Sequence, residues 1–368
     1  PQVHILSNGT FTTLITSSGG GYSQCVLPTK VRAEAEEGEA PDEEDLSGNK
    51  RALALTRWRA DTTLDPWGTF VYVQDLESDA VWSAARQPTA ARPEQQEVLF
   101  DPSLAEFRRR DHDISLRMQV TVPPEENVEI RRITLTNHSG QARHLAVTSY
   151  GEVVLAPAEV DRRHPAFNKL FVESEYLSEE GLLLFRRRPR SAEEAPVYLG
   201  HLVTAGEDQR LELTYETDRR VFLGRGHSAR DPRAVDPAVG NRDASLSGST
   251  GATLDPVMTL RVELEIAAHS TTEFAYVTAA AVSREEVIAV ARNYRQWEAV
   301  PRAFGQARSQ SVMALEELAL ESEEVEQMEL LLSTLIYPHP ALRSEPGTLA
   351  RNEKGQPGLW AYGISGDY

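Results

Sequence analysis

The sequence predicts a mainly β protein, an antiparallel sandwich built from two large sheets. Short strand-like runs recur between Ala80 and Ala281, and turn residues separate them without an intervening helical pattern. The pattern changes at Ser283, where apolar residues begin to recur at helical spacing. The chain of 368 residues is longer than one hydrophobic core usually serves, so we expect a further unit after the sandwich.

A hairpin is predicted at the start of the chain. His4–Leu6 and Thr10–Thr16 are strand-like, and Asn8-Gly9 between them favours a tight turn. Three glycines then end the run Ser17–Gly21, where the backbone either approaches another group closely or simply bends. A phosphate-binding loop is disfavoured because no Lys-Ser or Lys-Thr follows the glycines.

The segment Pro28–Lys50 differs in composition from its surroundings. It has few apolar residues, so we expect a solvated surface loop that is inserted between two strands. Such an insertion costs little, because each doubling of loop length adds only about 0.6 kcal/mol. Its acidic residues are Glu34, Glu36, Glu37, Glu39, Asp42, Glu43, Glu44 and Asp45.

The stretch Ala52–Asp75 combines two tryptophans, Trp58 and Trp67, with several arginines and aspartates, among them Arg57 and Asp61. One hypothesis is that these groups face a sugar, whose C–H faces stack on indole while its hydroxyls bond fixed polar groups. The alternative is a strand–turn–strand corner, with the tryptophans packed inside and the charges paired at its rim. The pattern by itself leaves both interpretations open.

The later predicted strands share alternating or β-branched residues and a turn at each end. They are Glu97–Phe100, Leu104–Arg110, Ile114–Val122, Val128–Thr136, His144–Leu155, Leu170–Tyr176, Leu182–Arg187, Val257–Ile266 and Thr271–Ala281. Helices are expected from Ser283, which forms a capping box with Glu286, and through Trp297–Leu320 and Glu323–Leu335.

Composition excludes several functions. A formal charge of −18 argues against a nucleic-acid partner, and no run approaches the roughly 20 apolar residues of a membrane span. The histidines lack helical pairing and Cys25 is the single cysteine, so we expect no metal site and a reducing compartment, the cytoplasm. The chain opens at Pro1 without a signal peptide, which suggests a piece of a longer polypeptide. No catalytic constellation can be assembled from spacing alone.

Several ordered segments resemble a known family. The chain is similar, almost end to end, to the N-terminal part of the glycoside hydrolase family 94 region of bacterial cyclic β-1,2-glucan synthases. Pro28–Lys50, Pro357 and Tyr368 depart from the family pattern. The matching segments include Leu6–Gly9, Gly19–Ser23, Leu55–Asp61, Asp65–Gly68, Val81–Ser83, Glu106–Asp111, Arg131–Asn137, Thr148–Pro157, His164–Phe171, Tyr215–Gly226, Leu254–Pro256 and Gly358–Asp367.

The resemblance implies three regions: a galactose-mutarotase-like β-supersandwich over residues 1–281 with 28–50 as an inserted loop, a helical linker over 282–340, and the start of an (α/α)6 barrel over 341–368. In the family the general acid and the phosphate-binding residues lie later in that barrel. We therefore expect no catalytic residue in this chain. The implied reaction is inverting phosphorolysis, with inorganic phosphate as the co-substrate and no further cofactor.

The resemblance also implies site residues and partners. Asp367 matches the family's donor-site aspartate, which bonds hydroxyls of the non-reducing glucose. Trp360, Arg57 and Asp61 are further candidates for substrate contact and are equally explained as parts of the sandwich–barrel interface. The implied partners are β-glucan or a glucose-containing oligosaccharide, the missing catalytic barrel and a second copy in a homodimer. The parent protein would lie in the cytoplasm or on the cytoplasmic side of an inner membrane. The alternative function is a stand-alone carbohydrate-binding or dimerisation sandwich without catalysis.

Overall fold

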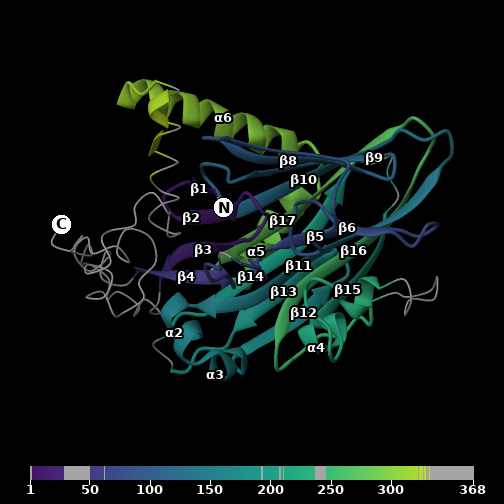
Figure 1. Cartoon of the computed structure of the whole chain (residues 1–368). Coiled ribbons are helices and arrows are strands. Elements are labelled where there is room, and N and C mark those ends of the chain that lie inside the picture. Colours follow the sequence, from purple (N-terminus) through teal and green to yellow (C-terminus); the bar gives the residue numbers. More distant parts are fainter. Residues whose placement is uncertain are drawn as a thin grey trace, which may run out of the picture.

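Strands dominate the structure, a computed structural model, and they form two antiparallel sheets (Figure 1). The prediction of a mainly β antiparallel sandwich is therefore confirmed. The structure describes residues 2–28, 50–61, 63–191, 194–206, 209, 211–236, 246–321, 323–325, 327–328 and 331.

The first sheet has the order β1-β2-β3-β4-β11-β16-β15, and β5 pairs with β11 and with β6 off this path. The predicted hairpin at the start is confirmed, with Ser7 opposite Thr12 and Gly9 at a φ of 90° in its turn. The strands are β1 (Val3–Ser7), β2 (Phe11–Thr16), β3 (Gly21–Pro28), β4 (Lys50–Thr56), β5 (Phe70–Asp75), β6 (Val81–Ser83), β11 (Arg143–Ala156), β15 (Glu212–Asp218) and β16 (Pro256–Ile266).

The second sheet has the order β12-β13-β14-β17-β10-β9-β8-β7. Apart from β14, its strands overlap the predicted runs closely, because their apolar and polar residues alternate as the pleat requires. They are β7 (Gln95–Asp101), β8 (Leu104–Asp111), β9 (Ile114–Thr121), β10 (Val128–Asn137), β12 (Val172–Leu177), β13 (Leu182–Arg187), β14 (Val197–Ala205) and β17 (Thr271–Ala281).

The main hydrophobic core lies between the two sheets, and a second core lies on the outer face of the second sheet. Within β10, Ile133 and Leu135 belong to the core between the sheets. Ile130, which has the opposite parity, belongs to the outer core together with Val287 of α5 (Arg284–Tyr294). The alternation predicted for this strand is thus confirmed, and both of its faces are covered.

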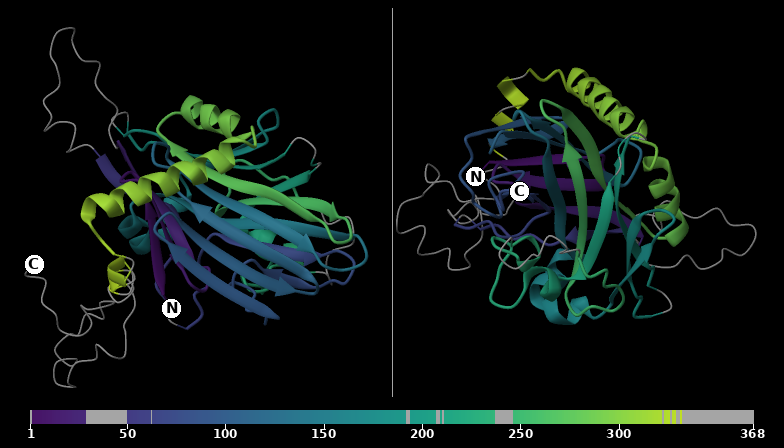
Figure 2. Two further views of the ribbon diagram at one scale, coloured as in Figure 1. Left: turned by 90° about the horizontal axis from the view of Figure 1, so that it is seen from above. Right: turned by 90° about the vertical axis from the view of Figure 1, so that its right-hand side faces the viewer.

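Two helices cover the outer face of the second sheet (Figure 2). The side chain of Ser283 accepts a hydrogen bond from the backbone N–H of Glu286, so the predicted cap begins α5. Ala299, Val300 and Ala303 of α6 (Ala299–Leu318) pack into the same outer core. None of the helices in the described ranges combines the length and the apolar content needed to cross a membrane. Most of the predicted helix Glu323–Leu335, and all of residues 341–368, lie outside the described residues.

Three short helices interrupt the strands between Ala80 and Ala281, where no helix is predicted. They are too short to show a helical period, which needs a window of about 11 residues. Leu170, predicted as the first residue of a strand, is instead the C-cap residue of the helix Pro165–Lys169, and the strand starts at Val172. Three strands, β6, β14 and β15, are absent from the sequence-based prediction. The helices are α2 (Ala158–Arg163), α3 (Pro165–Lys169) and α4 (Arg219–Leu223), followed by the 3-10 turn η1 (Arg233–Val235).

Candidate functional site

The glycine run packs against a buried carboxylate of the protein itself. Asp65, only 4% exposed, accepts hydrogen bonds from the hydroxyls of Thr16 and Ser18 and from the indole N–H of Trp58. A Cβ atom at Gly20 would lie 2.5 Å from a carboxylate oxygen of Asp65. Close backbone approach, one of the two interpretations of these glycines, is therefore confirmed.

Both tryptophans of the corner are half-buried and contact other side chains. The Trp58 ring stacks on Tyr22, with 6.0 Å between centroids and planes inclined by 9°. The Arg59 guanidinium lies over the Trp67 ring at 5.7 Å from its centroid. These contacts fit the packed corner, and they occupy the Trp58 N–H that a sugar hydroxyl would otherwise meet.

Arg57 is buried rather than at the rim of the corner, which corrects that part of the packed-corner interpretation. Arg57 is 6% exposed, and its Nε and Nη2 atoms donate to the two carboxylate oxygens of Asp161 at 2.9 and 2.6 Å. Its Nη1 atom donates to Glu152 at 2.5 Å. A bidentate pair of this kind fixes the planes of both groups.

The ion pairs continue from Glu152 across the same end of the sandwich. Arg219 Nε donates to the second oxygen of Glu152 at 2.6 Å, and its Nη1 lies 3.5 Å from Asp255. Asp255 is also paired with Lys169 of α3. Burial disfavours the charge of Glu152, but Arg219 and Arg57 outweigh it and hold the pKa of Glu152 below its ordinary value.

We call these six side chains the charge network. Arg57, Lys169 and Arg219 balance Glu152, Asp161 and Asp255, so the network is neutral when all six are ionised. Five of the segments that carry the family resemblance each contribute one member. The contributions are Arg57 from Leu55–Asp61, Glu152 from Thr148–Pro157, Lys169 from His164–Phe171, Arg219 from Tyr215–Gly226 and Asp255 from Leu254–Pro256.

A hollow of about 240 Å³ opens beside the network. Its lining joins the stacked pair Tyr22 and Trp58 to charged groups of Arg59, Asp161 and Arg162. An aromatic wall next to ionised groups is able to hold a polar ring or an interface side chain. Within the described residues, no group of three or more His, Cys, Asp or Glu side chains is arranged to hold a metal ion.

The predicted site residues lie in different surroundings. Arg57 lines the hollow, whereas Asp61 caps the following turn, where its carboxylate accepts from the N–H groups of Thr63 and Leu64 at 2.7 and 3.1 Å. Asp367 and Trp360 lie outside the described residues. Substrate contact by these four residues stays a prediction.

Sequence reasoning missed the partners of Arg57, because they are scattered over some hundred residues and meet only after folding. One signal was present. Glu152 stands within an apolar run of β11, and a carboxylate in such a run is rarely buried without a partner. This signal marks the residue but does not identify the residue with which it pairs.

The sequence of this chain is similar to those of several known proteins. The family model described as glycosyl hydrolase 94, supersandwich domain, matches residues 46–297. The chain is 30% identical over 364 residues to the cyclic β-(1,2)-glucan synthase NdvB of Rhizobium meliloti (strain 1021), a match that covers 99% of this chain and 12% of that protein. It is 25% identical over 166 residues to an N,N'-diacetylchitobiose phosphorylase of Vibrio proteolyticus, covering 45% of this chain and 18% of the phosphorylase.

Among solved structures, a bacterial glucoamylase complexed with acarbose aligns with a TM-score of 0.45 and 9% identity, over 90% of this chain and 40% of that chain. The chain thus spans only a small part of the curated relatives, 12% of one and 18% of the other. The family model, in contrast, matches well over half of this chain. This chain therefore belongs to the glycosyl hydrolase 94 family and carries its supersandwich domain.

Proposed function

We propose that this chain is the N-terminal, non-catalytic portion of an enzyme that performs inverting phosphorolysis or glucosyl transfer on β-1,2-glucan. The observation that carries the proposal is the charge network, on which five of the resembling segments converge at one end of the sandwich. The substrate class is suggested by the printed name of the glucan synthase relative, and phosphorolysis by the phosphorylase relative.

The network end has the properties of a platform for another domain. Buried ion pairs contribute little net stability, but breaking one is costly, so they hold their elements in a single arrangement. Apolar side chains of α3, α4 and the segment before β16 are exposed close to this arrangement, and exposed apolar groups gathered together mark contact surfaces. Figure 1 shows α2, α3 and α4 together at this end. The exposed side chains are Phe167, Leu170, Val221 and Leu254.

In this proposal the partner of the platform is a catalytic (α/α)6 barrel that begins in residues 341–368, after the sandwich at 1–281 and a linker at 282–340. Asp367 would bond donor-site hydroxyls, with Trp360, Arg57 and Asp61 near the substrate or the domain interface. Inorganic phosphate would serve as the co-substrate, without a metal or organic cofactor. We further propose a homodimer and a cytoplasmic location for the parent enzyme.

The alternative is a stand-alone sandwich that binds carbohydrate or mediates dimerisation without catalysis. The relatives disfavour it, because the curated matches are a glucan synthase and phosphorylases, which are enzymes. A supporting role also explains why an ion-pair network, rather than a set of unpaired acids, lies beside the hollow at this end.

The test compares the chain with the full-length gene product. The purified chain, given β-1,2-glucan and inorganic phosphate, should release no glucose 1-phosphate above a buffer blank, whereas the full-length protein should release it. In the full-length protein, Asp367→Asn should slow release roughly 30- to 1000-fold, because a charge-assisted contact worth about 2–4 kcal/mol in the transition state is weakened.

The melting temperature of the Asn variant serves as the control for folding. Release of glucose 1-phosphate by the chain alone would contradict the non-catalytic assignment. Near-normal turnover by the Asn variant would indicate that Asp367 caps a helix instead, a role in which Asn replaces Asp at little cost.

A further inference from the structure

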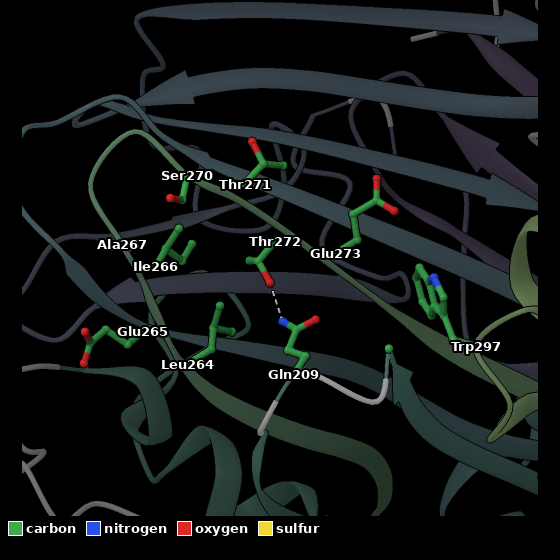
Figure 3. Close-up of a pocket in the computed structure, with 11 residues that line it drawn as sticks. Gln209, Leu264, Glu265, Ile266, Ala267, Ser270, Thr271, Thr272, Glu273 and Trp297 are labelled. Atoms are coloured by element: carbon green, nitrogen blue, oxygen red, sulfur yellow. Dashed lines mark hydrogen bonds between the residues drawn. The ribbon is translucent and has the colours of Figure 1, made fainter.

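A second and larger hollow lies at the other end of β16 (Figure 3). Its volume is about 620 Å³, within the roughly 300–1,000 Å³ of ligand pockets. Asp255 of the charge network directly precedes β16, whereas Leu264, Glu265 and Ile266 at the end of the strand line this hollow. At about 3.3 Å per residue, the two places are roughly 30 Å apart along the strand.

The hollow forms where two strands each extend past one of their two neighbours. Among the described residues, pairing of β14 with β17 ends at Ala205 opposite Phe274, and pairing of β15 with β16 begins at Glu212 opposite Glu263. The end of β16 and the start of β17 therefore project beyond these pairs, and Gly206 and Gln209, which follow β14, line the hollow beside them. The hollow is built into the sheet topology and does not depend on one side chain.

Its lining mixes polar and apolar groups, and none of the described residues that line it is basic. The amide of Gln209 donates to the hydroxyl of Thr272, and this hydrogen bond, dashed in Figure 3, fixes both side chains. Glu273 accepts from Thr134 at 3.2 Å. Trp297, half-buried, packs against the outer core and so presents a fixed aromatic group at one side of the hollow. The full lining is Gly206, Gln209, Leu264, Glu265, Ile266, Ala267, Ser270, Thr271, Thr272, Glu273 and Trp297.

We propose that this hollow is a carbohydrate-binding groove that holds a neutral glucan chain away from the charge network. Hydroxyl, amide and carboxylate groups supply the donors and acceptors that sugar hydroxyls need, and the indole supplies a surface for a sugar ring. A phosphorylated or otherwise anionic ligand would meet Glu265 and Glu273, and none of the described lining residues is a cation; Arg117, 3.8 Å from Glu273, lies outside the lining. The choice of glucan as the sugar rests on the proposed function.

Calorimetric titration of the whole chain with linear β-1,2-gluco-oligosaccharides tests the groove. Ala267 is exposed in the lining, so Ala267→Arg should obstruct part of the hollow without disturbing the core and weaken binding at least about tenfold, or 1.4 kcal/mol. Ala268→Arg is the matched control, because this neighbour in the same connection is not among the lining residues, and it should bind as the unchanged chain does. Trp297→Leu keeps apolar volume for the outer core but removes the indole, so it should also weaken binding, and its melting temperature reports on the fold.

A second titration, with linear β-1,4-gluco-oligosaccharides, separates the groove from the proposed function. Two results would contradict the groove: no detectable binding of the β-1,2 or the β-1,4 series by the unchanged chain, or equal binding by the unchanged chain and by Ala267→Arg. Binding of the β-1,4 series in place of the β-1,2 series, lost in Ala267→Arg, would support the groove while contradicting β-1,2-glucan as the substrate. Absence of glucose 1-phosphate release by the full-length protein would contradict the proposed function and leave a measured oligosaccharide affinity unaffected.

Discussion

Arg57 joins three elements. The residue directly follows β4, and its guanidinium donates to Glu152 on β11 and to Asp161 on α2. Its backbone N–H also donates to the carbonyl of Glu152 at 3.0 Å. Removing this side chain would leave two carboxylates in a buried site, each with one cationic partner fewer. Uncompensated burial of charge is among the most costly single changes in a folded protein.

We predict that Arg57→Met lowers the free energy of unfolding by about 3–5 kcal/mol, the range for breaking a buried ion pair. Arg284→Met is the matched control, since Arg284 pairs with Glu175 at 3.0 Å but both side chains are substantially exposed. That change should cost less than about 1 kcal/mol. Urea unfolding of the two variants measures the difference, and similar losses in both would show that the charge network has no special role in stability.

Residues of the site were predictable only one at a time. Arg57 stood out because a motif of alternating charges and tryptophans is unusual in a strand. Its partners did not, because Glu152 and Asp161 are ordinary acids until β11 and α2 bring them together. Single-residue chemistry is visible in the sequence, whereas pairing is a property of the three-dimensional fold.

At the scale of elements, the hairpin of β3 and β4 explains how the acidic segment is tolerated. Pro28 and Lys50 are direct partners in the ladder, so the segment leaves and re-enters the sheet at one point. Residues 29–49 lie outside the described residues, and their interpretation as an inserted loop stays a prediction. The ladder on either side is complete without them.

We predict that deleting Glu34–Asp45 and joining the ends changes stability little. The hairpin still closes, loop shortening is worth only about 1 kcal/mol, and removing like charges reduces repulsion. Scanning calorimetry should show a melting temperature within about 5 °C of the unchanged chain, since ~1 kcal/mol shifts a domain of this size by a few degrees. A larger fall would mean that the segment packs against the sandwich.

Apart from β14, a nine-residue strand that was missed, long elements were predicted well and short ones poorly, for a physical reason. Strands such as β10 and β16 repeat their alternation over many residues, and Ser283 marks a helix start through a local hydrogen bond. Helices α3 and α4 have five residues each, too few to show a period, and their positions depend on ion pairs with distant residues.

At the scale of the whole molecule, buried polar bridges join the two sheets through the core. His201 of β14 shares hydrogen bonds with Ser149 of β11 in the facing sheet and with Thr278 of β17. Glu129 of β10 accepts from Thr13 and Ser23 of the facing sheet as well as from Arg131. These bridges specify how the sheets face each other, because each buried polar group must keep its partner.

The bridges make the sandwich sensitive to acid. Burial disfavours the imidazolium form and lowers the pKa of His201 to about 3, from an ordinary value near 6.5. Burial disfavours the charge of Glu129, but Arg131 and the two hydroxyls outweigh it and hold the pKa of Glu129 below its ordinary value. Both groups bind protons more readily in the unfolded chain, so both destabilise the folded state as the pH falls.

The two groups act in different pH windows, which allows the histidine to be tested separately. His201 stabilises the folded state fully above pH ~6.5, where it is neutral in both states, and this stabilisation is lost as the pH falls toward about 3. The stabilisation that Glu129 and Glu152 provide is lost only as the pH falls below about 4.5, the region in which ordinary glutamates take up protons. Between these limits the histidine should dominate the change contributed by these three buried groups.

We therefore predict that the free energy of unfolding falls between pH 6.5 and 4.5, with His201 contributing up to about 1.4 kcal/mol per pH unit. His201→Gln retains a donor and an acceptor for Ser149 and Thr278 but takes up no proton, so its stability should vary less steeply with pH. His138→Gln, at an exposed position, is the matched control and should keep the slope of the unchanged chain. Urea unfolding at several pH values measures the slopes. If His201→Gln were as steep as the control, the acid sensitivity would have to arise from other groups.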